Sequence, residues 1–201
     1  IFESIGLWET LEPEIEAIKS IHVSDKGHLG ATRLHHTEEN VEALGYVAAS
    51  NEIGRVLMSE VQNLNHVDWY CPATIEGFQS IENAAHIEIK IDENLIALQG
   101  RLLVAADGVQ SATRKLAGIA TKEDDYQQSA VITNVQTDQL HQGIAFERFT
   151  DTGPIAFVPM TKNRYSVVWT CRREDVQRIL NLTDTAFINE LQQRFGFRAG
   201  N

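Results

Sequence analysis

The stretch from Asp107 to Arg114 holds the residues whose types and spacing are best suited to binding a cofactor. It reads Asp-Gly-Val-Gln-Ser-Ala-Thr-Arg and follows residues 102–106, a continuously apolar run typical of strands that are buried on both faces. Such strands belong to parallel sheets, and ligands bind beyond their carboxyl ends. We therefore expect a ligand to lie next to Asp107.

The groups in this stretch are able to contact different parts of a nucleotide. The Asp107 carboxylate can accept hydrogen bonds from sugar hydroxyls, and Gly108 lets a ligand approach the backbone because it has no side chain. The start of the following helix offers free N–H groups to phosphate oxygens, while Arg114 adds positive charge or pairs with Asp107. The alternative is purely structural, since Asp-Gly is also common in turns after core strands.

Several helices are predicted from the spacing of apolar residues. Residues 1–11 have near-helical spacing, Pro13 interrupts them, and residues 15–18 indicate a further short turn. Asn51 is suited to cap the next helix. The apolar stripes are Ile53, Val56, Leu57, Val61 and Leu64 in that helix, and Phe187, Ile188, Leu191 and Phe195 in a final helix that Thr183 or Asp184 caps.

Strands are predicted in the segments between these helices. Residues 21–46 mix polar and apolar positions with glycines, as in short strands and turns, and residues 67–70 form a strand. Residues 87–91 alternate as a half-exposed strand does, and residues 92–94 form a turn. Four long runs then indicate an antiparallel sheet, at residues 130–135, 144–149, 155–160 and 165–170.

The composition excludes several classes of protein. With 201 residues, 43% hydrophobic and 22% charged, the chain is a globular protein that can bury a core. The net charge of −11 argues against nucleic-acid binding, which needs clustered Lys and Arg. No apolar run approaches the ~20 residues that span a bilayer, and no leader pattern is present, so we expect a cytoplasmic protein.

Three other kinds of site find no support in the residue spacing. Cys71 and Cys171 lack any CxxC pattern, which predicts two reduced, buried thiols. No metal is expected, because the histidines at 28, 35 and 36 belong to no recognisable ligand pattern. Ser111 has no Gly-x-Ser-x-Gly context, so a hydrolase triad is not expected.

The full string Asp-Gly-x-x-Ser-x-x-Arg resembles the second cofactor motif of the para-hydroxybenzoate-hydroxylase-type flavoprotein monooxygenases. Three more strings are similar to one branch of that family, the 2-octaprenyl-6-methoxyphenol hydroxylases of the ubiquinone pathway. They are HVSDKGH at residues 22–28, AFERFT at 145–150 and GPIAFVPM at 153–160. The similarity runs over essentially the whole chain.

The resemblance implies a mixed α/β (α+β) fold in two portions. Residues 1–20 and 51–118 would be part of an FAD-binding, Rossmann-like portion. Residues 21–50 and 119–201 would form an antiparallel-sheet, substrate-binding portion. The Gly-x-Gly-x-x-Gly loop and the Gly-Asp motif of the family are expected before Ile1 and after Asn201. We therefore expect a central fragment that does not hold FAD tightly by itself.

The resemblance also implies roles for particular residues. Asp107, Gly108, Ser111 and Arg114 would serve FAD and its NAD(P)H reductant. Arg55 falls where relatives place a polar side chain close to the flavin, although it is as well explained as a solvated helix residue.

Four residues of the predicted sheet are candidates for the substrate pocket, because the corresponding sheet of this family roofs the aromatic substrate. They are Phe146, Phe157, Pro159 and Trp169. Ordinary core packing is the alternative for each, since the face to which a strand residue points depends on a register that the sequence does not determine.

The resemblance implies hydroxylation of a polyprenylated methoxyphenol with O2. FAD would activate the O2, so the resemblance implies no particular catalytic side chain. The long lipid tail implies work at a membrane surface or within a multi-enzyme assembly. Two alternative functions remain open. One is a sister hydroxylase of the same pathway acting at another ring carbon, and the other is a non-catalytic module that holds substrate or supports assembly.

Overall fold

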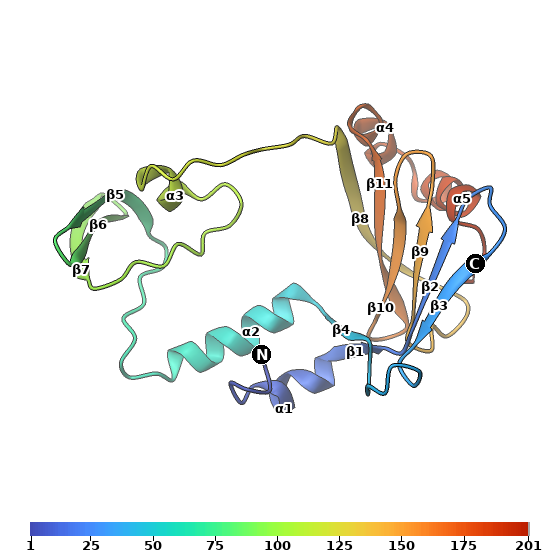
Figure 1. Ribbon diagram of the computed structural model, residues 1–201, viewed down its shortest axis with the longest axis horizontal. Coiled ribbons are helices and arrows are strands. Elements are labelled where there is room, and N and C mark those ends of the chain that lie inside the picture. Colours follow the sequence, from blue (N-terminus) through green and yellow to red (C-terminus); the bar gives the residue numbers. More distant parts are fainter. Residues whose placement is uncertain (201) are drawn as a thin grey trace. The chain divides into compact units, whose positions relative to one another are not determined.

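The computed structural model describes residues 1–200 as two compact units. The first unit contains Ile1–Asn63 together with the residues from Asp125 onward, and the second contains Leu64–Asp124. Both units combine helices with strands (Figure 1), so the predicted mixed α/β class is confirmed. The division into a cofactor portion and a substrate portion stays a prediction.

A six-stranded sheet forms the centre of the first unit (Figure 1). Neighbouring strands are antiparallel, except that β2 and β9 run parallel. The four long runs predicted from the sequence are confirmed as β8, β9, β10 and β11. In sheet order the strands are β3 (Ala31–His35), β2 (Ser20–Asp25), β9 (Ile144–Phe149), β10 (Ile155–Met160), β11 (Arg164–Arg172) and β8 (Gln128–Gln136).

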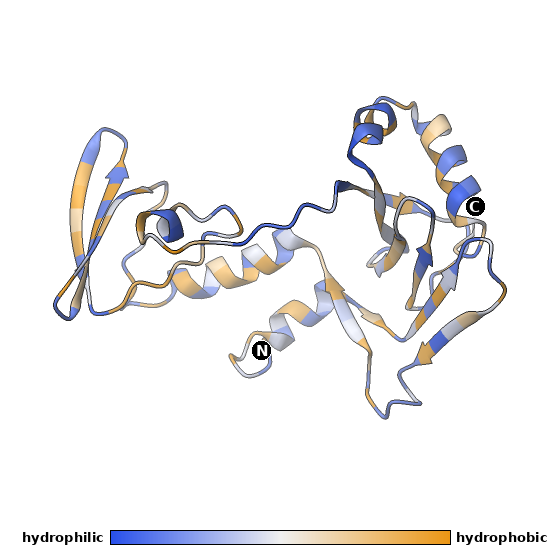
Figure 2. Ribbon diagram, turned by 45° about the horizontal axis from the view of Figure 1, so that its top comes forward, coloured by the Kyte–Doolittle hydropathy of each residue, from blue (hydrophilic) through white to orange (hydrophobic). Residues whose placement is uncertain are grey.

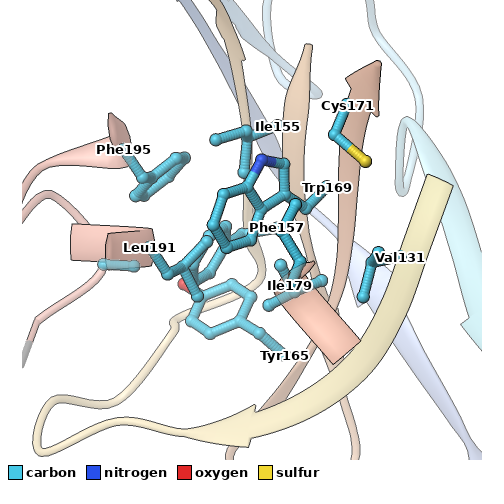
Figure 3. Packing of buried hydrophobic residues seen from close by; sticks show 11 residues of the cluster. Val131, Ile155, Phe157, Tyr165, Trp169, Cys171, Ile179, Leu191 and Phe195 are labelled. Carbon is cyan, nitrogen blue, oxygen red and sulfur yellow. The ribbon is translucent and has the colours of Figure 1, made fainter. Parts of the chain in front are cut away.

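Two helices, α4 (Val176–Leu180) and α5 (Asp184–Phe195), lie on the same face of this sheet and follow a 3-10 turn, η2 (Arg173–Asp175). The predicted cap of α5 is confirmed, because the Thr183 hydroxyl accepts a hydrogen bond from the Ala186 N–H. Both α2 and α5 carry hydrophilic as well as hydrophobic residues (Figure 2), as amphipathic helices do. The buried cluster between helices and sheet contains Val131, Ile155, Phe157, Tyr165, Val167, Trp169, Cys171, Ile179, Leu191, Phe195 and Ala199 (Figure 3).

The amino-terminal elements differ from the prediction in detail. They are α1 (Trp8–Leu11), the 3-10 turn η1 (Glu12–Glu14), β1 (Ile15–Ile18), which pairs with β4 (Gly45–Ala48), and α2 (Ser50–Gln62). The turn predicted at residues 15–18 is wrong, because pairing with a strand almost thirty residues away overrides the local spacing. Asn51 lies inside α2 and makes no cap, and Leu64 lies beyond its end. A small core of Leu7, Leu11 and Val56 joins α1 to α2.

The second unit is built on a three-stranded antiparallel sheet of β5 (Thr74–Ile81), β6 (Ala84–Ile91) and β7 (Asn94–Gly100), followed by α3 (Ala112–Leu116). The half-exposed strand predicted at residues 87–91 is confirmed. The turn that follows it is confirmed too, with Asp92 in the left-handed region at φ 53°.

Three predictions for the second unit are wrong. Residues 102–106 and 67–70 form no strand, and Leu102 and Val104 are 78% and 73% exposed. The described part of the chain provides no parallel strand to pair with residues 102–106, and an apolar run becomes a buried strand only between such neighbours. Cys71 is an exposed free thiol because it follows the irregular 67–70 segment, whereas Cys171 is buried and free as predicted. None of the helices within residues 1–200 is long and apolar enough to cross a membrane.

Candidate functional site

The Asp107 carboxylate organises the turn that leads into α3. One of its oxygens accepts a hydrogen bond from the Ser111 hydroxyl, and the other accepts from both the backbone N–H and the hydroxyl of Thr113, each at 3.0 Å. Gly108 follows Asp107 in this loop and has φ +84°, a conformation that side-chain-bearing residues rarely adopt. Asp107 thus holds the loop and the first turn of the helix together. Thr113 is not among the residues predicted from the sequence, although a hydroxyl residue two positions after a Ser cap is a recognisable sign.

Ser111 caps α3, since its hydroxyl oxygen accepts from the Arg114 N–H at 2.9 Å. The first turn of α3 was expected to offer free N–H groups to a phosphate. Instead, the Thr113 N–H donates to the Asp107 carboxylate, and the Arg114 N–H donates to the Ser111 hydroxyl oxygen. These local side-chain acceptors leave neither N–H free for a phosphate. The Arg114 guanidinium donates to the Val109 carbonyl at 2.9 Å rather than pairing with Asp107.

The pKa of the Asp107 carboxyl lies well below its ordinary value of 3.8, chiefly because the Ser111 hydroxyl and then the Thr113 N–H donate to the ionised form. A carboxyl with a depressed pKa in the folded state stabilises that state above its ordinary pKa. It loses this contribution as the pH falls toward the folded value.

We expect the α3 turn to loosen as the pH is lowered from about 4 to about 2. Amide hydrogen exchange at Thr113 and Arg114 should accelerate relative to exchange in β6 over this range. Asp107→Asn should exchange faster at neutral pH and show little further change in acid. Equal pH dependence in both proteins would contradict this role of Asp107.

A cleft of about 440 Å3 adjoins this turn within the second unit. Three of the predicted cofactor residues, Gly108, Ser111 and Arg114, line it. The remaining wall is mostly apolar, and its residues are Phe78, Leu103, Ala105, Thr113, Ala117 and Ile119. A concave, mostly apolar space with a few polar groups and one cation is typical of sites that bind part of a cofactor.

Arg55 lies on α2, in the first unit. Its guanidinium Nε donates to a Glu52 carboxylate oxygen at 2.8 Å, and its side chain is 56% exposed. This i,i+3 ion pair is the arrangement expected of a solvated helix residue. The geometry therefore adds nothing to the predicted flavin role of Arg55, which stays a prediction.

The four candidate substrate residues all lie on the face of the sheet that α4 and α5 cover. The register pairs Phe157 with Phe146 and Ile155 with Trp169, and paired residues share a face. Trp169 is fully buried and Phe157 is 5% exposed, with the Phe157 ring stacked on Phe195 at 4.0 Å between centroids. Pro159 is buried too. This is what ordinary core packing, the alternative interpretation, predicts.

The opposite face of the same sheet is less covered. On β10 and β11 it carries Ala156, Val158, Ser166 and Val168, which are all half-buried, and on the edge strand β8 it carries Ile132, which is 69% exposed. These side chains alternate with the core residues along each strand. They are not among the residues predicted from the sequence, because small aliphatic and hydroxyl side chains carry no signal that distinguishes a substrate face from ordinary strand positions.

A model of the FAD binding domain family matches residues 1–200. The chain is 36% identical to an uncharacterized protein of Synechocystis sp., slr1300, over all of this chain and 48% of that protein. It is 30% identical to the ubiquinone hydroxylase UbiL of Rhodospirillum rubrum, over all of this chain and 46% of UbiL. It is also 30% identical to the mitochondrial ubiquinone biosynthesis monooxygenase COQ6 of Schizosaccharomyces pombe, over 96% of this chain and 42% of COQ6.

Among solved structures, the fold is similar to that of PqsL, a probable FAD-dependent monooxygenase from Pseudomonas aeruginosa. The TM-score is 0.78 and the sequence identity 19%, over 96% of this chain and 54% of PqsL. The chain therefore belongs to the FAD binding domain family. The resemblance to ubiquinone-pathway hydroxylases predicted from its motifs is confirmed as a similarity to UbiL and COQ6. The chain spans about half the length of the curated relatives it matches.

Proposed function

We propose that the full-length protein to which this chain belongs hydroxylates the aromatic ring of a polyprenylated methoxyphenol, using FAD, a reduced nicotinamide donor and O2. The observation that carries this proposal is the match of the whole described chain to the family, together with relatives named as ubiquinone hydroxylases. The strings at residues 22–28, 145–150 and 153–160, which resemble that branch, support the same substrate class.

The cleft beside α3 suits one end of a dinucleotide such as FAD. A Cβ built on Gly108 would meet no atom within 4 Å, so space in front of its backbone is open to a ligand. The Arg114 side chain brings a positive charge to the cleft, and Leu103 and Ala105 supply apolar wall. When bound, FAD supplies the activation of O2. The protein has to hold the flavin, orient the phenol and keep water away from the reacting atoms.

We assign the phenol to the less covered face of the six-stranded sheet rather than to the face that α5 covers. Val158 and Val168 supply apolar contact there, and the Ser166 hydroxyl offers a hydrogen bond to a ring substituent. The four residues predicted from the sequence would act indirectly, by fixing the shape of the strands that carry this face.

Replacing Val168 by threonine tests the assignment of the substrate face. The change keeps the side-chain shape but replaces one methyl group by a hydroxyl. We expect kcat/KM to fall about fivefold, which corresponds to about 1 kcal/mol of lost apolar contact, while the melting temperature stays the same. The matched control is Val167→Thr on the same strand. Because Val167 is 0% exposed, this change should cost about 1–3 kcal/mol of stability without altering kcat/KM of the folded enzyme. The reverse pattern would assign the substrate to the helix-covered face.

The activity itself is tested on the full-length protein by supplying FAD, NADH or NADPH, O2 and prenylphenols of defined ring substitution. We expect oxidation of the nicotinamide that depends on the phenol, and a product with one more ring hydroxyl. Hydroxylation at another ring carbon would assign the sister activity. Binding of the phenol without turnover would instead favour a substrate-holding module.

A further inference from the structure

A group of basic side chains gathers where β3, β2 and β9 lie side by side. The register places Arg33 opposite His22 and Arg148 opposite Ser24, so these side chains share one face of the sheet. It is the face of Phe146, whose ring lies 5.7 Å from that of His22. Two consecutive strands, β2 and β3, and the distant strand β9 thus bring an imidazole and two guanidinium groups together.

The hydrogen bonds of this group leave donors without acceptors. The Arg33 guanidinium Nε donates to His22 Nδ1 at 3.2 Å, so Nδ1 is an acceptor and the ring proton of neutral His22 is on Nε2. His22 is 9% exposed, and its Nε2 is buried without a partner. The Nε and Nη1 atoms of Arg148 are also buried without a partner among the described residues. Buried polar atoms are rarely left unpaired, because each one costs free energy that water would otherwise supply.

The charge of the group is strongly positive. A third guanidinium, that of Arg198, lies close enough to lower the pKa of His22, after burial and Arg33, which have the larger effects. The carboxylate that acts on Arg148 is that of Asp25, which is already paired with His28 at 2.8 Å. One carboxylate shared with His28 does not balance three guanidinium groups, and uncompensated charge in a partly buried site is destabilising. A bound anion would offset the remaining charge and supply the missing acceptors.

We propose that His22, Arg33, Arg148 and Arg198 form a binding site for an oxyanion, a phosphate or carboxylate group of a small molecule. Each of the unpaired donors, on His22 and Arg148, can give a hydrogen bond to an anionic oxygen, and such charge-assisted bonds are stronger than neutral ones. This site belongs to the first unit and shares no residue with the Asp107 cleft of the second. The residues of this site are therefore distinct from those proposed to contact FAD.

Titration of the protein with inorganic phosphate tests the proposal. The buffer is Tris chloride, and the readouts are the heat of binding and the NMR signals of the His22 ring. We expect saturable binding that moves the Nε2 resonance of His22. Arg148→Gln should weaken binding about tenfold or more, since one charge-assisted donor group is lost. The matched control, Arg172→Gln, removes an exposed arginine of β11 whose contact with Glu174 is loose, at 3.9 Å, and should leave binding unchanged.

Acetate serves as the second arm of the titration. Binding of phosphate alone identifies a phosphate ligand, binding of acetate alone a carboxylate ligand, and binding of both a general oxyanion site. If Arg148→Gln does not fold, Arg33→Gln on the exposed strand β3 replaces it and should also weaken binding. The proposal is overturned if no anion moves the His22 signals saturably, or if the glutamine variants bind phosphate as tightly as the unmodified protein. Neither result depends on hydroxylase activity, so this proposal and the proposed function can fail separately.

Discussion

Trp169→Ala is expected to lower the free energy of unfolding of the first unit by about 3–5 kcal/mol, the range for removing a large aromatic side chain from a core. Trp169 is 0% exposed and lies 5.5 Å from the Phe187 ring of α5, while the Arg194 guanidinium lies 5.7 Å above it. The cavity left by alanine would border both the helix and the sheet (Figure 3). Urea denaturation followed by far-ultraviolet circular dichroism measures the change without relying on tryptophan fluorescence.

Trp69→Ala, in the second unit, is the control for loss of a tryptophan side chain that is not buried. Trp69 is 55% exposed in an irregular segment, so its removal should change stability by no more than about 0.5 kcal/mol. A Trp169→Ala protein of normal stability that had lost affinity for the phenol would contradict the core assignment. That result would instead support the prediction that Trp169 contacts the substrate.

In the full-length protein, Asp107→Ala is expected to weaken FAD binding or slow flavin reduction by a factor of about 10 to 100. The carboxylate holds Ser111 and Thr113, so its removal frees the loop that carries Gly108 at the edge of the cleft. Arg114→Ala should act in the same direction, because it removes the positive charge of the cleft. Equilibrium titration with FAD and anaerobic reduction by NADH or NADPH measure the two quantities.

Ser111→Ala separates the two ways in which Asp107 can act. If Asp107 works by shaping the loop, Ser111→Ala should lose FAD affinity in parallel, since it removes both a donor to the carboxylate and the cap of α3. If the carboxylate itself binds the cofactor, Ser111→Ala should lose much less than Asp107→Ala. Normal FAD affinity and normal reduction rates in both Asp107→Ala and Arg114→Ala would end the cofactor role of this motif.

The sequence by itself determined the features that depend on neighbouring residues. Alternation over residues 87–91 predicted the half-exposed part of β6, because side chains two residues apart share a face whatever lies beside them. Long strand-like runs predicted β8, β9, β10 and β11. The Thr183 cap of α5 and the turn at Asp92 were predicted for the same reason, since each involves residues within a few positions of one another. The family was predicted from contiguous strings of the same kind, and it is confirmed by the match over residues 1–200.

Only the tertiary structure decided which of these residues meet. The parallel pairing of β2 with β9 joins segments more than one hundred residues apart, and it alone brings His22 close to Arg148. The packing of α5 decided that Phe157 and Trp169 are core while Val158 and Val168 lie on the less covered face. Residues 102–106 are apolar enough for a buried strand, yet burial needs partner strands on both sides, and their composition carries no information about whether those partners are present.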